Sequence, residues 1–508
     1  MKRLLYILLS ILPAGMAAQN MYEIAPLMQN DLTGTSRYIS MGGSMGALGA
    51  DISVMGSNPA GIALYRSSDF SFTGSMGFNN VKSTYNGNCV KSDNTNFDVE
   101  SFGAVLASKV EDFSNLKYLN FGIGYRRKNG LANEFSVAGP AFGYSQQYAI
   151  RELYDTRKFK LDQIGKYDYD KLYNYWLPML ATYANIGDTD GNLITRPDGS
   201  LIYEPTDIEF HSEERGGATE VDFNFAANIG DRFYWGATLS LVNVDYTINS
   251  LYYEIDDAGD IYSIGNYKHI EGSGYNIKLG AIWRPFRYSP LKLGIAVHTP
   301  TWYELNNCSY ADIEGPFGDF YDTRDYDLYN GHLESESKWS SPWRYLASAS
   351  YTFGTFMALN VDYEYTDYST AKYKFVGLGS AKGQNEEIAY NLKEQHTVRI
   401  GAELNLGGGM TLRGGYLYST APFKTDAYKE MLNMQVTETA TDYNNRYSKE
   451  AVTLGGGYRG KTFYFDMAYV FDTQKSDFYP YYDPQEPNPA ARMEYSNHTV
   501  TATLGMRF

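Results

Sequence analysis

Apolar and polar side chains alternate with a period of two along much of this chain. In the last nine residues, one face of an extended strand would carry only apolar side chains, and the other face only polar ones or glycine. The apolar row is Val500, Ala502, Leu504, Met506 and Phe508, and the opposite row is Thr501, Thr503, Gly505 and Arg507. The same alternation recurs in segments 277–283, 398–404 and 463–469. We therefore predict an all-β fold whose strands each have one apolar face.

This alternation predicts fourteen strands of about ten residues, the length at which a tilted strand crosses a bilayer. Their ranges are 69–78, 100–109, 119–127, 218–228, 234–246, 274–283, 291–298, 343–352, 356–365, 395–405, 410–418, 451–459, 462–470 and 498–508. Connections after even-numbered strands are short, whereas those after odd-numbered strands are long, the largest spanning about 128–217. Such regularity is typical of a transmembrane barrel with tight turns at one end. We expect a 14-stranded antiparallel transmembrane β-barrel over residues 68–508, with both chain ends in the periplasm.

The beginning of the chain has the pattern of a secretory signal peptide over residues 1–18. Lys2 and Arg3 precede an apolar run, and small residues follow up to a cleavage position near Ala18. No later apolar run is long enough for a transmembrane helix. The net charge of −16 disfavours a nucleic-acid partner. Cys89 and Cys308 are too few for a disulfide framework, and the sequence leaves open whether they form a single bridge.

Residues 19–67 are rich in glycine and small side chains and have no regular period. The stretch 42–46 matches G-x-S-x-G, which surrounds the nucleophile of many serine hydrolases. That motif requires a strand before Ser44, a helix after it and later acid and histidine partners. We recognise none of these in the sequence. We therefore predict no enzyme and no catalytic residue, and we expect these residues to fold into the barrel lumen as a hatch.

The segment 34–64 resembles the N-terminal hatch of the FadL/TodX family of outer-membrane transporters for hydrophobic compounds. The matching residues are Arg37, Met41, Gly42, Gly43, Ala47, Asp51, Asn58, Pro59, Ala60 and Gly61. The resemblance implies a 14-stranded barrel in which a ligand is captured outside and leaves sideways through a gap at a kinked third strand. Gly122 and Gly124 would permit such a kink in this chain. The alternative is that these two glycines only ease packing against the hatch.

Four inward-facing cations are candidate contacts for a fatty-acid carboxylate in the lumen: Lys278, Arg399, Arg413 and Arg459. The alternative is that they form ion pairs across a hydrated barrel interior. A further segment, 167–187 in the large loop, has the apolar spacing of an amphipathic helix and is a candidate roof for the barrel mouth. The alternative is a loop that only packs on its neighbours.

These features favour passive transport of hydrophobic compounds, with long-chain fatty acids first, across the outer membrane of a Gram-negative bacterium. We expect a monomer whose partners are a hydrophobic ligand and membrane lipid, without cofactor or metal. An apolar pocket in the lumen would favour transport over a secretion-system shuttle protein of the same fold. Uptake of haem or aromatic compounds remains a further alternative, and an outer-membrane lipase would require a Ser–His pair that the sequence does not assemble.

Overall fold

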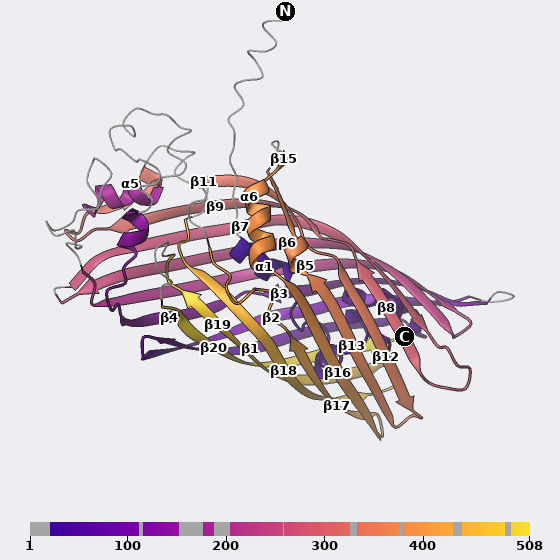
Figure 1. Ribbon diagram of the computed structural model, residues 1–508. Coiled ribbons are helices and arrows are strands. Elements are labelled where there is room, and N and C mark those ends of the chain that lie inside the picture. The colour runs from indigo at the N-terminus through magenta and orange to yellow at the C-terminus, as the bar shows by residue number, and fades with distance from the viewer. Residues whose placement is uncertain are drawn as a thin grey trace, which may run out of the picture.

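The computed structural model describes residues 21–110, 115–151, 176–186, 204–257, 259–325, 333–375, 379–429, 439–482 and 489–508. Within them, fourteen strands form one closed antiparallel sheet, because β20 pairs with β1 as well as with β19. In order around the barrel the strands are β1 (Asp69–Tyr85), β2 (Asn88–Lys109), β3 (Leu116–Gly130), β5 (Asp207–Ile229), β6 (Phe233–Asp256), β7 (Gly259–Trp283), β8 (Lys292–His298), β12 (Arg344–Phe353), β13 (Met357–Asp367), β16 (Glu394–Gly407), β17 (Met410–Ser419), β18 (Tyr443–Arg459), β19 (Phe463–Tyr479) and β20 (Ala491–Arg507). Every predicted strand overlaps one of these (Figure 1), so the predicted fold class is confirmed.

Several strands continue well beyond the predicted ten residues, and this changes two of the expected loops. The connection after the first predicted strand is a two-residue turn at Asn86 and Gly87, whose φ angles are 45° and 89°. Positive φ at both positions is typical of the tight turn that suits a twisted hairpin. β6 and β7 likewise remain paired out to Asp256 and Gly259. The prediction of a long loop after every odd-numbered strand is therefore wrong at these two places.

Shorter strands extend the sheet at the same end of the barrel. They are β4 (Asn133–Pro140), β9 (Trp302–Glu314), β10 (Phe320–Asp322), β11 (Leu333–Ser340), β14 (Lys372–Phe375) and β15 (Gly379–Ser380). We call this end the loop end, and the opposite end, where β20 meets the start of β1, the turn end. Cys89 and Cys308 lie in β2 and β9 as free thiols, so they form no bridge.

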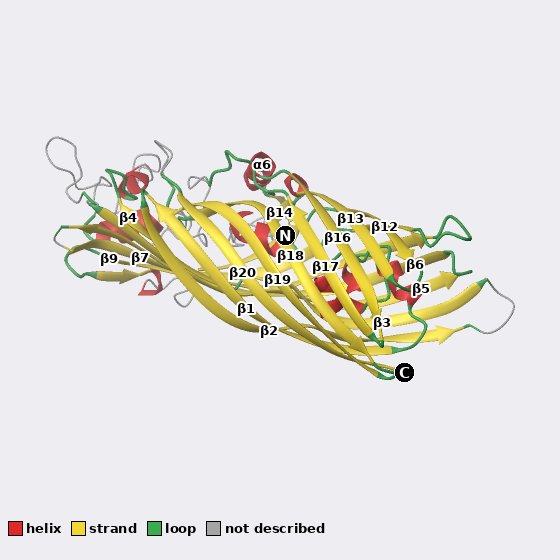
Figure 2. Ribbon diagram, turned by 90° about the horizontal axis from the view of Figure 1, so that it is seen from below, coloured by secondary structure: helices red, strands yellow, loops and turns green. Residues whose placement is uncertain are grey.

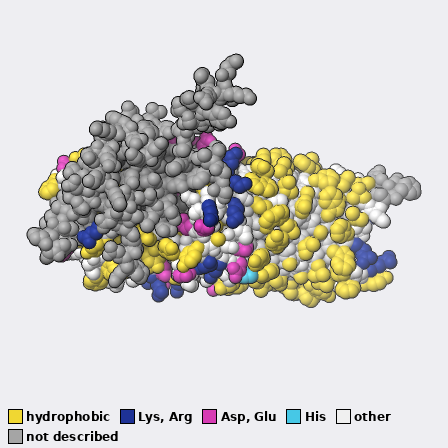
Figure 3. All heavy atoms as spheres, turned by 45° about the horizontal axis from the view of Figure 1, so that its top comes forward, with side chains coloured by type: hydrophobic (Ala, Val, Ile, Leu, Met, Phe, Trp, Pro, Cys, Tyr) yellow, Lys and Arg dark blue, Asp and Glu magenta, His cyan; other side chains and the backbone are white. Residues whose placement is uncertain are grey.

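A band of exposed apolar side chains surrounds the turn-end part of the barrel. Burial alternates residue by residue along β6, where Leu239 and Leu241 are exposed and their neighbours are buried. Figure 3 shows this band on one face of the molecule, with charged side chains only beyond its edges. Exposed aromatic side chains mark both edges, Trp235 and Trp283 toward the turn end and Tyr275 and Trp302 toward the loop end. A tall apolar band between aromatic girdles indicates that the barrel spans a membrane.

The N-terminal segment lies inside the barrel. It contains the helices α1 (Met21–Met28) and α2 (Ser36–Ser40) and the 3₁₀ turns η1 (Ile52–Gly56) and η2 (Pro59–Leu64), seen among the strands in Figure 2. Two further helices lie at the loop end: α5 (Trp176–Tyr183), within the segment predicted to be helical, and α6 (Lys382–Asn391). None of the helices in the described ranges is long and apolar enough to cross a membrane.

Candidate functional site

We define residues 33–64 as the hatch loop. It packs closely against the barrel wall at positions where the wall has glycine and therefore no side chain. A Cβ added to Gly415 on β17 would come within 3.0 Å of the backbone of Met41 and Gly42, and one added to Gly401 would come within 2.5 Å of the Met41 carbonyl oxygen. Gly42 and Gly43 have φ angles of +64° and +74°, a conformation that side chains with a Cβ rarely adopt. The backbone of the hatch loop therefore lies directly on the backbone of the wall.

Side-chain caps hold the turns of the hatch loop. Asn58 accepts a hydrogen bond from the Ala60 amide at 3.2 Å and donates one to the Gly46 carbonyl at 2.7 Å, which closes the turn that begins with Pro59. The carboxylate of Asp51 accepts bonds from the Thr35 hydroxyl at 2.8 Å and the Ser53 amide at 3.0 Å. Irregular backbone is thus satisfied internally, as burial inside a barrel requires.

Arg37 joins the hatch loop to the barrel wall. Its guanidinium binds both carboxylate oxygens of Glu403 on β16, at 3.0 and 3.2 Å, and donates to the Ala50 carbonyl at 2.7 Å. Arg413 on β17 binds the same Glu403 at 2.6 Å and also Asp466 on β19 at 2.6 Å. This buried chain of charges connects the hatch loop to three wall strands, β16, β17 and β19.

A carboxylate of the barrel wall accepts hydrogen bonds from backbone amides next to Ser44, which water would otherwise accept. Asp362 on β13 accepts hydrogen bonds from the amides of Met45 and Gly46, each at 3.0 Å. The hydroxyl of Ser44 is buried and lies 2.8 Å from the Asn360 amide nitrogen, which donates to it. The G-x-S-x-G stretch therefore contributes to the seat of the hatch loop.

Gly122 and Gly124 lie where β3 passes the hatch loop. Added Cβ atoms would come within 2.9 Å of the Met55 sulfur and within 2.7 Å of its methyl group. Both glycines remain in register with β2 and β5. The pairing of β3 with β5 shifts further along, between Arg127 and Asn129. The structure therefore places these glycines in close packing and the strand irregularity beyond them.

Backbone hydrogen bonds join β2 and β3 over only part of their length. Pairing runs from Lys109 opposite Tyr118 to Ser101 opposite Arg126 and ends there, although both strands continue toward the loop end. Beyond this point β4 approaches β2 through isolated bonds, such as the one from the Ser136 amide to the Ser92 hydroxyl at 3.2 Å. The described part of the wall thus has a gap in its backbone pairing here.

Three of the four candidate carboxylate contacts are engaged in internal ion pairs. Lys278 lies 2.9 Å from Glu220 and 3.2 Å from Asp222, and Arg399 lies 2.9 Å from Glu364. Arg413 is paired as described above. Their charges are already balanced, which favours the ion-pair interpretation for these three residues.

Arg459 differs from these three cations. Two of its guanidinium nitrogens are buried without a hydrogen-bond partner. It lies beside Arg37 and Arg507 in a pocket of about 10 Å³ on the turn-end side of the hatch loop. That volume is about enough for one water molecule, so the pocket does not hold a ligand headgroup in this conformation.

A cavity of about 200 Å³ lies in the lumen between the hatch loop and the loop end. It reaches the gap between β2 and β3, where Asn96 and Asn133 line it. Its lining carries charged side chains, namely Asp31 of the N-terminal segment and, from the strands, Glu100, Arg127, Arg344, Glu364, Arg399, Arg446, Lys449 and Asp472. The prediction of an apolar lumen pocket is wrong for this cavity, because the inward positions of these strands carry the polar half of the alternating pattern.

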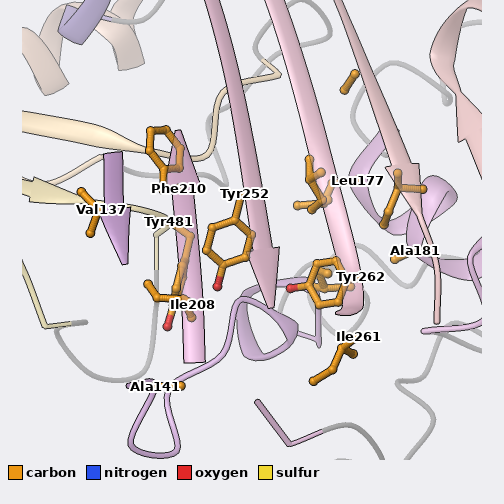
Figure 4. Packing of buried hydrophobic residues seen from close by; sticks show 14 of the residues in the cluster. Val137, Ala141, Leu177, Ala181, Ile208, Phe210, Tyr252, Ile261, Tyr262 and Tyr481 are labelled. Atoms are coloured by element: carbon orange, nitrogen blue, oxygen red, sulfur yellow. The ribbon is translucent and has the colours of Figure 1, made fainter. Parts of the chain in front are cut away.

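The mouth of the barrel at the loop end is closed by an apolar cluster. Figure 4 shows this cluster, in which Phe210, Tyr252 and Tyr481 lie beside Val137 and Ile208, and Tyr262 lies near Leu177 of α5. Leu177 and Ala181 of α5 belong to the same cluster and are at most 1% exposed. The described part of the large loop therefore covers the lumen from this side, as expected for a roof.

One carboxylate is buried at the edge of this roof. Glu254, near the outer end of β6, accepts hydrogen bonds from the Ser145 hydroxyl at 2.8 Å, the Gln146 amide at 2.6 Å and the Tyr252 hydroxyl at 2.9 Å. Burial raises the pKa of the Glu254 carboxyl above its ordinary value, although these hydrogen bonds oppose the effect. Glu254 thus fastens the segment around Ser145 over the barrel mouth.

The architecture is that of the FadL-type outer-membrane barrels. A FadL homologue from Pseudomonas aeruginosa is 11% identical, with 94% of this chain and 99% of that chain covered and a TM-score of 0.56. The toluene transporter TodX from P. putida is 12% identical, with coverage of 94% and 99% and a TM-score of 0.52. No sequence family and no curated protein matches this chain by sequence. At such low identity the likeness concerns the fold.

Sequence reasoning missed the acidic partners of Lys278 and Arg399, although it marked Glu403 and Asp466, the partners of Arg413, as inward-facing. Glu220, Asp222 and Glu364 each alternate with apolar residues along their strands, so the pattern already marked them as inward-facing. The roles of Asp362 and Glu254 had no such signal, because each accepts bonds from backbone amides that only the fold brings near.

Proposed function

We propose that this protein is an outer-membrane channel of a Gram-negative bacterium that takes up hydrophobic compounds by diffusion, with long-chain fatty acids as the first candidate. The exposed apolar band and the FadL-type fold support the membrane location. The sheet closes on itself through β20 and β1, so none of the fourteen described barrel strands is an edge strand over its whole length, which supports a monomer. No covalent chemistry is needed, since partition of an apolar solute into the bilayer supplies the driving force.

We further propose that the ligand leaves the lumen sideways, between β2 and β3. The observation that carries this step is the end of the β2–β3 ladder at Ser101 and Arg126, beside the lumen cavity. Gly122 and Gly124 would act indirectly, by seating Met55 of the hatch loop against the part of β3 that remains paired. The hatch loop blocks the direct route toward the turn end.

The experiment compares two neighbouring residues on opposite faces of β2. Asn96 lines the cavity at the gap, whereas Phe97 is 74% exposed on the outer face. In a strain that lacks its own fatty-acid transporter, Asn96→Trp should lower uptake of labelled oleate at least severalfold by filling the gap. Phe97→Trp should leave uptake unchanged.

Equal uptake by the two variants, both correctly assembled, would contradict lateral release at this gap. Absence of oleate uptake by the wild-type protein would contradict the substrate class. Co-purification of a secreted protein instead of a lipid would favour the shuttle alternative.

A further inference from the structure

Five basic side chains lie at the turn end, where β2 joins β3, β5 joins β6 and β7 joins β8. The chain as a whole has a net charge of −16, so a group of cations without acids is unexpected on its surface. Figure 3 shows lysine and arginine side chains beyond the turn-end edge of the apolar band. We call the five residues the basic patch: Lys109, Lys117, Arg232, Arg284 and Arg287.

Backbone hydrogen bonds join the three turns that carry the basic patch. The amide of Gly230 donates to the Asn115 carbonyl at 2.6 Å, which links the β5–β6 turn to the start of β3. The amide of Arg284 donates to the Arg232 carbonyl at 2.7 Å, which links the β7–β8 turn to the β5–β6 turn. The cations therefore belong to one continuous surface of the barrel.

The two central arginines are held by neutral acceptors. A guanidinium nitrogen of Arg232 donates to the Pro285 carbonyl at 2.8 Å, and Nε of Arg284 donates to the Ser289 carbonyl at 3.0 Å. A carbonyl oxygen fixes a guanidinium without cancelling its charge, and the group has further N–H donors to offer. Both arginines are thus positioned in advance for an anion.

The basic patch lacks carboxylates that would neutralise it. In the part of the chain that the structure describes, no ion pair involves any of its five members. The nearby Asp231 is already bound by Arg66 at 2.5 Å and by the Asn228 amide at 2.8 Å. The sequence of the β2–β3 turn adds Glu111 and Asp112, which lie outside the described residues. Even with these acids counted, the cations of this region remain in excess.

The two arginines lie directly beyond the aromatic girdle of the turn end. Phe233 and Trp283 are opposite each other in the β6–β7 ladder, and both are exposed on the outer face. Arg232 and Arg284 are the next residues along the chain on the side away from the membrane. One residue advances a strand by about 3.3 Å, so the arginines lie at the depth of lipid headgroups.

The β7–β8 turn also exposes two aromatic side chains beside these arginines. Phe286 is 60% exposed and Tyr288 is 93% exposed, and the guanidinium of Arg287 lies 5.9 Å from the centre of the Tyr288 ring. Aromatic rings next to basic residues are typical of surfaces that enter the interfacial layer of a membrane. The basic patch therefore combines free positive charge with apolar side chains at the membrane boundary.

We propose that the basic patch binds the phosphate group of a phospholipid whose headgroup has a net negative charge, in the bilayer leaflet at the turn end. Arg232 and Arg284 donate charge-assisted hydrogen bonds to the phosphate oxygens. Phe286 and Tyr288 lie against the glycerol and the first carbons of the acyl chains. This inference rests on the membrane location of the barrel and is independent of the compound that the channel transports.

The first test compares retention of phosphatidylglycerol and of phosphatidylcholine, with equal acyl chains, by native mass spectrometry of the full chain in non-ionic detergent. The wild type should retain phosphatidylglycerol preferentially. The double variant Arg232→Gln, Arg284→Gln should lower its retention at least tenfold, since a basic residue near a membrane surface contributes about fivefold in affinity. Retention of phosphatidylcholine should change little.

Two further variants separate charge at this patch from other effects. Lys461→Gln is the matched control, because Lys461 is also exposed at the turn end but lies on the opposite side of the barrel, between β18 and β19; it should leave the preference unchanged. The double variant Arg232→Lys, Arg284→Lys changes the bonds within the turn but keeps the charge, and it should retain most of the preference. Heat-modifiable migration on gels verifies that each barrel is assembled.

The second test locates the bound lipid and probes the aromatic side chains. A phosphatidylglycerol with a photoactivatable diazirine near its headgroup should form cross-links mainly within residues 230–233 and 283–291. The double variant Phe286→Ser, Tyr288→Ser should lower retention of both lipids. Phe463→Ser is its control, since Phe463 is 68% exposed at the turn end beside Lys461, and it should lower neither.

Equal retention of the two lipids by the wild type would overturn the inference, and so would cross-links spread evenly around the barrel. An equal loss in Lys461→Gln and in the double glutamine variant would show general attraction to a basic rim and would also overturn a site at the basic patch. All of these outcomes leave the proposed transport intact. Absence of oleate uptake by the wild type, with the lipid preference present, would count against the proposed function alone.

Discussion

Two adjoining parts of the N-terminal segment are held inside the barrel in different ways. The hatch loop is fixed by directional contacts: glycine-lined backbone contact, side-chain caps and the Arg37–Glu403 ion pair. The helix α1 is held mostly by packing in an apolar cluster. Directional contacts lose their energy after small displacements, whereas apolar packing is restored by any occupant of suitable volume. The hatch loop also packs in a buried apolar cluster, so the difference lies in the directional contacts that it has in addition, and these contacts make its position the more sharply defined of the two.

The largest effect is expected when the charge that anchors the hatch loop is removed. Arg37→Met leaves Glu403 with only Arg413, and breaking a buried pair typically costs about 3 kcal/mol or more. The hatch loop should then open in a substantial fraction of molecules, and influx of a large polar antibiotic should rise strongly. Arg215→Met, at an exposed side chain, is the control; equal influx in both variants would contradict the anchoring role.

A smaller leak is expected when the backbone contact is disturbed. Gly415→Ala forces a methyl group against Met41 and Gly42, and overpacking of this kind costs about 1–3 kcal/mol. Gly414→Ala is the matched control, since its nearest neighbour would be 3.6 Å away. Antibiotic influx should rise only in Gly415→Ala, and a leak of similar size in Gly414→Ala would show that the barrel, not the hatch seat, had been perturbed.

No leak is expected when α1 is loosened. Leu27→Ala removes apolar packing from the cluster around α1, but the hatch loop still closes the turn end of the lumen. Hydrogen exchange of residues 21–28 should accelerate while exchange of residues 33–64 stays the same. Acceleration in both segments would show that α1 and the hatch loop open as one unit, which would remove the distinction drawn between them.

The smallest effect concerns the roof, which resembles the hatch loop in using directional bonds. The pKa of Glu254 is raised by burial, so its neutral form stabilises the closed roof below the ordinary carboxyl pKa of about 4.5, and this stability is lost as pH rises through the folded-state value. Exchange in residues 141–151, relative to Glu254→Gln at each pH, should accelerate modestly from about pH 4 to about pH 8. A constant ratio would show that Glu254 does not titrate in this range.

Much of the barrel could be predicted because the alternation of apolar and polar side chains is a pattern of residues that are close together in the sequence. A residue two positions along a strand shares the same face, so Val398, Ile400 and Ala402 alone mark a lipid-facing row. The same pattern predicted which cations face inward, and Lys278, Arg399 and Arg413 lie among the charges of the lumen. It did not predict how far the strands continue, because beyond the apolar band the outer face of β1 and β2 no longer has to be apolar.

The lumen was less predictable, because its contacts join distant parts of the chain. The alternation marked Glu403 as inward-facing but did not show that Arg37 would reach it across more than three hundred residues. The apolar cluster around α1 was missed altogether, since β6, β7, β9, β11 and α6 each contribute only one to three of its buried apolar residues. No short stretch of sequence carries such a signal.

The sequence by itself determined the strand count, the apolar outer face and the glycine-rich character of the hatch, since each is written in the spacing or composition of neighbouring residues. Only the tertiary structure decided which charges balance one another, where the β2–β3 ladder ends and what fills the lumen. The physical reason is that closing a barrel brings side chains from all fourteen strands into one enclosed space. Their burial and pairing there depend on distances that the order of residues does not specify.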